Sequence, residues 1–231
     1  ENHIFQARKL NSASIRWNWL RLKDLNVGDK LKVPRLKMFN NQKNLSIFDL
    51  PQRDIGFIAG ILLGGGCYTD KQLTTHKNFY ISSNQDDKDW NSLVKAKLSF
   101  LRQNEDGVSK TSKSLSMYFV GDDSLRLIDE LGLDKVTSVD KKIPMKLINS
   151  NKDLLVGLLD GLISTGGDIN CGERTPPVIR FRTSSKQLSQ DLRLVLHMLG
   201  IHCKIYTRRP HEAVSGGRVI YGKENYDVQI H

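Results

Sequence analysis

The chain has 231 residues, of which 39% are hydrophobic and 26% charged, enough for the packed core of one large or two small domains. The net charge of +10 and the pI of about 9.5 favour a polyanionic partner, nucleic acid first, with a merely basic soluble protein as the alternative. The longest apolar runs, near 57–63 and 154–163, have about half the length of a membrane span, which argues against a membrane protein.

The cysteines indicate neither a zinc site nor a disulfide framework. Cys67, Cys171 and Cys203 are odd in number and widely spaced, and no CxxC pair occurs. This pattern favours a reducing, intracellular setting, in the nucleus or the cytoplasm according to the host. No signal peptide opens the chain, and the start at Glu1 suggests a further segment upstream.

Two predicted helices resemble each other at a constant offset of 101 residues, with FIAGILLGGG at 57–66 and LLDGLISTGG at 158–167. Each helix has one stripe of small residues four positions apart. Glycine costs a helix interior about 1 kcal/mol relative to alanine, so a repeated stripe predicts that two helix backbones approach closely. The stripes are Gly56, Gly60 and Gly64 in the first helix and Gly157, Gly161 and Thr165 in the second.

Each glycine-rich helix opens a unit that is predicted to continue as strand, strand, helix, strand and strand. The first unit has predicted elements at 78–84, 88–101 and 114–120. A further helix is predicted at 124–131, with Asp122 or Asp123 as N-cap and Gly132 as C-terminal stop. The second unit has elements at 177–185, 186–199, 201–209 and 225–231, and it stops where the corresponding last helix should begin.

The strands of the second unit have one apolar and one basic face, because successive side chains point to opposite sides. Ile179, Phe181 and Ile205 are predicted to face a core covered by two helical stripes. These are Leu188, Leu192, Val195 and Leu199 in one helix and Trp90, Leu93, Val94 and Leu101 in the other. The uncovered face carries Arg180, Arg182, Lys204, Tyr206 and Arg208. A curved basic sheet of this kind can lie in the DNA major groove, although an ordinary solvated face is the alternative.

The two glycine-rich helices resemble the paired motifs of the LAGLIDADG homing endonucleases, particularly those embedded in inteins. Four flanking stretches match the family in order: ISSN at 81–84, KKIP at 141–144, TSSKQLSQDL at 183–192 and LGIH at 199–202. The resemblance implies an α+β fold of two pseudo-symmetric αββαββα repeats with a saddle-shaped antiparallel sheet. Repeat 1 with its linker would span 49–150 and repeat 2 would span 151–231. The protein would be a monomer with an internal pseudo-dimer that binds double-stranded DNA.

The N-terminal segment 1–48 carries a second resemblance. WLRLKDLNVGDKLKVP at 19–34 is similar to an intein splicing (Hint) segment that ends in a turn and a strand. His3 falls where the family has a helper histidine, although an unremarkable terminal histidine is the alternative. The chain lacks the nucleophile and the terminal His–Asn pair that splicing requires, so as given it should not splice. We expect the central portion of an intein or its ordered remnant.

Glycines stand where the family has its metal-binding acids. Those positions are Gly65 and Gly166, and Ser164 replaces a further acid of the second motif. Divalent magnesium needs carboxylate oxygens, and the metal generates the attacking hydroxide, so the usual cleavage route should be lost. No cofactor is expected as given, with magnesium only if some cleavage persists. Asp168 is the possible substitute ligand, ahead of Asp160 and Asp70.

Lys141 matches the active-site lysine of the family. Without a metal it would contact phosphate, with Lys142 as the immediate substitute and a solvated linker lysine as the alternative. The leading hypothesis is a DNA-binding module that does not cleave. The alternatives are an active magnesium-dependent endonuclease, a splicing element with a relic domain, and a regulator that uses the inactive scaffold.

Overall fold

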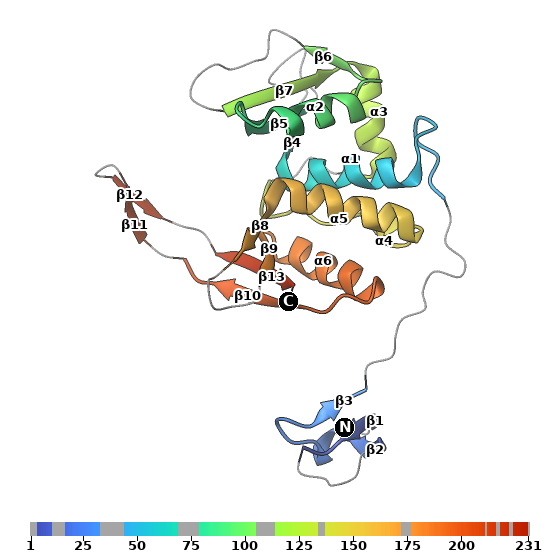
Figure 1. Ribbon diagram of the computed structural model, residues 1–231, viewed down its shortest axis with the longest axis vertical. Coiled ribbons are helices and arrows are strands. Elements are labelled where there is room, and N and C mark those ends of the chain that lie inside the picture. Colours follow the sequence, from blue (N-terminus) through green and yellow to red (C-terminus); the bar gives the residue numbers. More distant parts are fainter. Residues whose placement is uncertain are drawn as a thin grey trace. The chain divides into compact units, whose positions relative to one another are not determined.

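The structure, a computed structural model, describes residues 4–10, 17–32, 44–68, 79–104, 114–133, 137–171, 177–210, 212–215, 218–221 and 224–230. The chain divides into two units, residues 1–37 and residues 38–231 (Figure 1). This division falls earlier in the chain than the boundary at 48 that the sequence suggested. Ile47 is buried in the core of the second unit, and the Gln52 side chain exchanges two hydrogen bonds with the Leu45 backbone, so 44–48 lie with that unit.

The first unit is a small antiparallel sheet with the strand order β2-β1-β3. Its elements are β1 (Ile4–Arg8), β2 (Asn18–Arg21), the 3-10 helix η1 (Leu22–Asp24) and β3 (Lys30–Leu31). Gly28 has a φ of 98°, which suits glycine, in the turn before β3. The Asp29 carboxylate accepts bonds from the backbone nitrogens of Asn26 and Leu10, and these bonds lower the pKa of Asp29. The predicted turn and the strand after it are therefore found.

The first half of the second unit places helices on an antiparallel sheet of order β4-β5-β7-β6. Phe79, Ile81, Met117 and Phe119 alternate along two strands and are all buried, as a half-covered sheet requires. The elements are α1 (Gln52–Gly65), β4 (Gly66–Tyr68), β5 (Phe79–Asn84), α2 (Lys88–Lys97), β6 (Arg102–Asn104), β7 (Ser114–Val120) and α3 (Asp122–Leu131).

The second half repeats this order of elements around a sheet of order β10-β13-β9-β8. A hairpin that the sequence analysis did not predict, made of β11 and β12, lies between β10 and β13. The elements are α4 (Met145–Ile148), α5 (Lys152–Gly166), β8 (Gly167–Asn170), β9 (Val178–Thr183), α6 (Lys186–Met198), β10 (Cys203–Arg208), β11 (Glu212–Ser215), β12 (Arg218–Tyr221) and β13 (Asn225–Ile230). None of the described helices has the length and apolar character needed to cross a membrane.

Helices α1 and α5 lie side by side between the two sheets (Figure 1). A Cβ atom added to Gly56, Gly60, Gly157 or Gly161 would overlap a backbone carbonyl oxygen of the facing helix. A Cβ on Gly60 would also lie only 2.8 Å from the Cα of Gly161. Gly64 faces Thr165, whose hydroxyl donates to its own helix at Gly161 O and Leu162 O. The helix backbones therefore touch directly along both stripes.

Three local predictions were wrong. Helix α2 ends at Lys97 rather than at 101, because Leu98 leaves the helical conformation at φ −110° and ψ 18°. Leu93, assigned to the core stripe, is 42% exposed. Helix α3 begins at Asp122, and its N-cap is Gly121, whose φ is 100°. Neither Asp122 nor Asp123 is therefore the N-cap. Both lie in the first turn, where a negative charge interacts favourably with the helix dipole.

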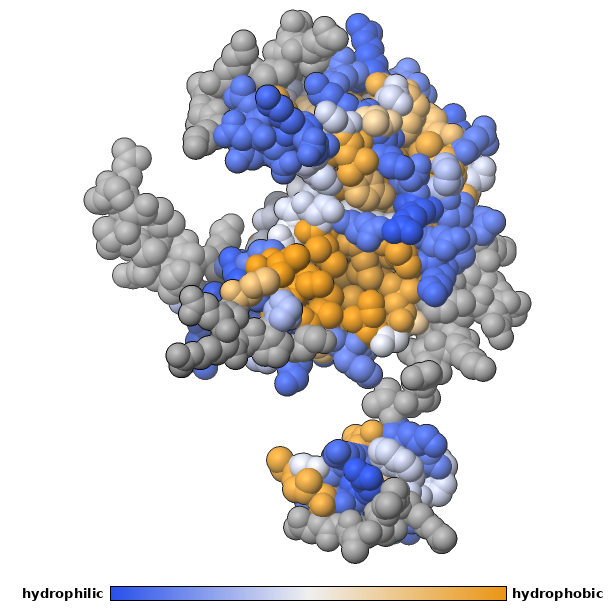
Figure 2. Space-filling model, viewed as in Figure 1, coloured by the Kyte–Doolittle hydropathy of each residue, from blue (hydrophilic) through white to orange (hydrophobic). Residues whose placement is uncertain are grey.

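The two halves differ in how well their apolar side chains are covered. In the first half α3 packs on β7 and buries Leu127, Ile128 and Leu131. Four apolar side chains of the second half are partly exposed although their counterparts in the first half are buried. The pairs are Val156 and Ile55, Ile163 and Leu62, Ile179 and Phe79, and Ile230 and Phe119. Apolar surface accordingly gathers over α5 and α6 (Figure 2).

Candidate nucleic-acid interface

The two positions expected to hold acids, Gly65 and Gly166, lie at the C-terminal ends of α1 and α5. Their surroundings are unequal. A Cβ on Gly65 would lie 3.3 Å from the Cβ of Thr165, a tight contact that a small shift relieves. A Cβ on Gly166 would lie 2.8 Å from the ring of Phe181, which is buried in the core. A side chain therefore fits at 65 more readily than at 166.

Lys141 lies directly beside the end of α1. Its ammonium donates to the carbonyl oxygens of Leu63 at 2.8 Å and Gly66 at 2.9 Å, where the partial negative charge of the helix end attracts a cation. Its own carbonyl accepts a bond from the Ser185 hydroxyl, which also caps α6. Lys141 is therefore held at the base of the helix pair, whereas Lys142 next to it is exposed.

The described residues at the base of the helix pair do not present the cluster of carboxylates that a divalent cation prefers. Gly65 and Gly166 have no side chains, and among the described residues no three His, Cys, Asp or Glu side chains gather closely enough to hold a metal. Asp160 pairs with Arg53 at 2.7 Å on the outside of the helix pair. Asp70 and the N-terminal His3 lie outside the described residues.

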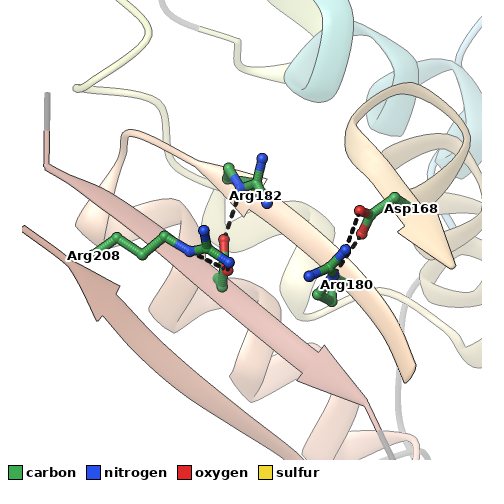
Figure 3. Close-up of polar contacts among 5 residues, drawn as sticks. Asp168, Arg180, Arg182 and Arg208 are labelled. Carbon is green, nitrogen blue, oxygen red and sulfur yellow. Dashed lines mark hydrogen bonds and ion pairs between the residues drawn. The ribbon is translucent and has the colours of Figure 1, made fainter. Parts of the chain in front are cut away.

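Asp168, the other possible ligand, is engaged by an arginine on the outer face of the second sheet (Figure 3). Arg180 donates from Nε to one carboxylate oxygen at 2.9 Å and from Nη2 to the other at 2.6 Å. This bidentate pair lowers the pKa of the Asp168 carboxyl and raises the pKa of Arg180. Both oxygens of Asp168 are thus already occupied by hydrogen bonds.

A second cluster on this face centres on Asp227, which the sequence analysis did not single out. Arg182 Nε donates to Oδ1 of Asp227 at 2.9 Å, and Arg208 donates to Oδ2 from both Nε and Nη2 at 2.6 Å. The Asp227 side chain is 1% exposed, whereas Arg182 and Arg208 are 48% and 49% exposed. The buried carboxylate thus accepts bonds from two half-exposed arginines, and Figure 3 shows that Arg182 and Arg208 come from different strands of the sheet.

The other predicted contact residues share this outer face. Strand pairing places Lys204 opposite Gln229 and Gln229 opposite Arg180, and Tyr206 lies opposite Asp227. Phe181, Val228 and Ile205 point the other way, toward α6 and the core. The face therefore combines four cations, Arg180, Arg182, Lys204 and Arg208, with two carboxylates, and it keeps a net positive charge.

The outer face of the first sheet, which the sequence analysis did not assign to a site, is polar and largely uncharged. Tyr80 and Tyr118 are cross-strand neighbours with ring centroids 5.2 Å apart, and the hydroxyls of Ser82 and Ser116 lie 3.5 Å apart on the next row. The alternation in FYISSN at 79–84 and SLSMYFV at 114–120 is the signal that could have predicted this face.

Comparison with solved structures defines the class of fold. A mesophilic variant of the homing endonuclease I-DmoI is 13% identical, with a TM-score of 0.51, over 78% of this chain and 89% of that chain. A variant of I-DmoI in complex with its nicked target DNA and in the presence of Mn is 11% identical, with a TM-score of 0.52, over 82% and 90%. At these identities the likeness concerns the fold alone, and the chain has an α+β LAGLIDADG-like fold with antiparallel sheets.

Sequence comparison narrows the assignment. Residues 153–228, from α5 into β13, match the family model of the LAGLIDADG-like domain. The chain is 28% identical over 217 residues to the replicative DNA helicase DnaB of Rhodothermus marinus, covering 88% of this chain and 21% of that protein. It is 23% identical over 200 residues to DnaB of a Nostoc species, covering 81% and 21%. The chain thus spans about a fifth of the length of both relatives.

Proposed function

We propose that this chain is the double-stranded-DNA-binding module of an intein homing endonuclease of the LAGLIDADG type, with metal-dependent cleavage lost or strongly impaired. The observation that carries the proposal is the outer face of the second sheet. It presents Arg182 on β9 and Arg208 on the edge strand β10 at half exposure, and Lys204 and Tyr206 lie on β10 as well. A basic antiparallel face of this kind suits a DNA groove.

The two halves would act as an internal pseudo-dimer in a monomeric protein. Their common order of elements and the matching glycine stripes of α1 and α5 support a pseudo-two-fold axis between the helices. Each sheet would then contact one half of a long target, and the two outer faces would form one saddle. The first face would contribute aromatic and hydroxyl groups and the second face would contribute arginines.

The intein context is supported by what the relatives are and by what this chain lacks. The chain matches only a fifth of each DnaB relative, and its own sequence contains no complete G-x-x-x-x-G-K-[ST] phosphate-binding motif. A LAGLIDADG-like domain inserted into the helicase would explain the match. The first unit exposes several large apolar side chains, which supports its membership of a larger splicing domain. These are Leu10, Trp17, Trp19, Leu22, Val27 and Leu31.

The direct test of DNA binding is fluorescence anisotropy of labelled duplexes titrated with the full chain over a series of salt concentrations. The logarithm of the binding constant should fall linearly with the logarithm of salt, with a slope of roughly −0.9 per phosphate contact. Lys204→Gln should make the slope shallower by about one contact. The matched control is Lys186→Gln on α6, which packs on the inner face of the same sheet. Absence of duplex binding even at low salt would refute the proposal.

An active endonuclease is the second candidate, and the position of Lys141 beside Gly65 favours it. Nicking of plasmids that carry the uninterrupted insertion site, with magnesium or manganese, tests it directly. Gly65→Asp with Gly166→Asp tests whether the scaffold can be reactivated. Because a Cβ at 166 meets the Phe181 ring, the design includes Phe181→Ile, which copies Ile81 at the matching place in the first sheet. Nicking by the unaltered chain would overturn the proposed loss of cleavage.

A further inference from the structure

The Asp227 cluster is built differently from an ordinary surface ion pair. Asp227 lies on β13 between β9 and β10, with Arg182 directly opposite on one neighbouring strand and Arg208 two positions from the opposing residue on the other. Its carboxylate is buried and accepts bonds from both guanidinium groups. Burial of a carboxylate is unfavourable unless hydrogen bonds satisfy its oxygens. Removal of either arginine would therefore leave the buried Asp227 carboxylate incompletely bonded.

The cluster leaves both arginine side chains about half exposed, so N–H groups that are not bonded to Asp227 remain accessible. A guanidinium has five N–H groups, and Arg182 uses only Nε on Asp227 while Arg208 uses Nε and Nη2. The remaining Nη groups are the ones that can donate in pairs. Guanine presents two acceptors, O6 and N7, side by side in the major groove, and a bidentate arginine is the side chain that matches them.

The shared carboxylate also changes what these arginines are suited to bind. Two guanidinium groups with one carboxylate carry a net charge of +1, so their attraction to phosphate is weaker than that of two free cations. Asp227 fixes their side-chain conformations before DNA arrives, which lowers the entropy lost on binding. Lower charge and fixed geometry favour reading of base edges over contact with the backbone.

Arg180 provides an internal contrast. It uses Nε and Nη2 on Asp168, but there the arginine is 21% exposed and the carboxylate 52% exposed, so the acid is the outer group. Arg208 also gives its Nε and Nη2 to a carboxylate, so the contrast lies in exposure, since Arg180 is 21% exposed and Arg208 is 49% exposed. At Asp227 the acid is buried and the arginines are the outer groups, whereas at Asp168 the acid is the outer group. Arg180 is therefore not expected to read a base.

We propose that Arg182 and Arg208 are specificity-determining residues that each read a guanine in the major groove, and that Asp227 is the positioning residue that holds both. This inference rests on the proposed DNA binding. It assigns two G·C base pairs to the half of the target that the second sheet contacts. The two guanines would lie near each other, because both arginines share one carboxylate.

The test is selection of duplexes from a randomised library by the full chain and by single variants, with sequencing of the bound fraction. Arg182→Lys and Arg208→Lys keep the charge but remove the bidentate edge. Each should lose the guanine preference at one position, with discrimination there falling about 5- to 150-fold. Asp227→Asn should weaken the preference at both positions without weakening binding to random duplexes. Arg180→Lys is the matched control and should leave both positions unchanged.

The outcomes separate this inference from the proposed function. If the unaltered chain binds no duplex, the proposed function fails and this inference falls with it. If the chain binds but selects no guanine that Arg182→Lys or Arg208→Lys relaxes, only the inference is overturned. An equal loss of affinity on every sequence would identify the arginines as phosphate contacts and would also overturn it. Circular dichroism of the two lysine variants, whose parent side chains are half exposed, verifies that they fold.

Discussion

At the scale of single residues, the second sheet shows how the same pair of charged groups can have two roles. Asp227 is covered by Arg182 and Arg208, whereas Asp168 projects beyond Arg180 into solvent. Surface ion pairs contribute little to stability because water and salt screen them. Asp168 should therefore affect mainly how stability changes with pH. Asp227 should act mainly by fixing the side-chain geometry of Arg182 and Arg208.

The Asp168–Arg180 pair predicts a contribution to acid stability. The pKa of Asp168 is lowered below its usual 3.8 in the folded protein, mainly by the bonds from Arg180. A lowered folded pKa stabilises the folded state above the unfolded value, and this contribution is lost as the pH falls below about 3.8. Asp168→Asn should therefore flatten the fall of the urea midpoint with pH in this acid range. Asp86→Asn, at an exposed carboxylate in the turn before α2, is the control. An unchanged profile for Asp168→Asn would contradict the assignment.

At the scale of elements, the sequence predicted those parts whose signals are local. The glycine stripes, strand β7 at Ser114–Val120 and the left-handed Gly132 after α3 all follow from short-range patterns. The β11–β12 hairpin also had a local signal, because the Gly216-Gly217 pair between two short segments that contain valine favours a two-residue hairpin turn. The role of Asp227 had no local sequence signal, because its partners Arg182 and Arg208 are 45 and 19 residues away in sequence and only the strand register brings them together.

The helix pair predicts that adding one methyl group to a stripe is destabilising. Alanine is the better helix former by about 1 kcal/mol, but a Cβ at Gly161 would overlap the carbonyl oxygen of Phe57. Gly161→Ala should lower the free energy of unfolding by roughly 1–3 kcal/mol, as overpacked cores do. Ser164→Ala, on the exposed side of α5, should be neutral within about 0.5 kcal/mol. Urea denaturation measures both, and equal stability of the two variants would argue against direct backbone contact.

At the scale of the whole second unit, one hydrophobic cluster runs from the first sheet through the helix pair to the second sheet. The two ends of this cluster are not equally buried. Helix α3 packs over the first half, whereas Val156 and Ile163 in the second half are partly exposed. Equivalent positions of the two halves therefore have unequal surroundings despite the common order of elements.

This asymmetry predicts unequal effects of matched truncations. Leu62 is fully buried, so Leu62→Ala should cost about 2–5 kcal/mol, the range for a cavity in a packed core. Ile163, at the same place in α5, is partly exposed, and Ile163→Ala should cost less than half as much. The measurement is the free energy of unfolding in urea for both variants. A larger loss for Ile163→Ala would mean that the second half is covered in solution.

The hydrogen bonds of Lys141 have a consequence for how cooperatively the second unit unfolds. Its ammonium is bonded to the end of α1 in the first half, and its carbonyl accepts the hydroxyl that starts α6 in the second half. One linker residue thus connects the C-terminal end of α1 in the first half to the N-terminal end of α6 in the second half. Melting of either half would break these bonds and expose the helix pair that both halves share. Residues 38–231 are therefore expected to unfold in a single transition, with no stage at which one half persists without the other.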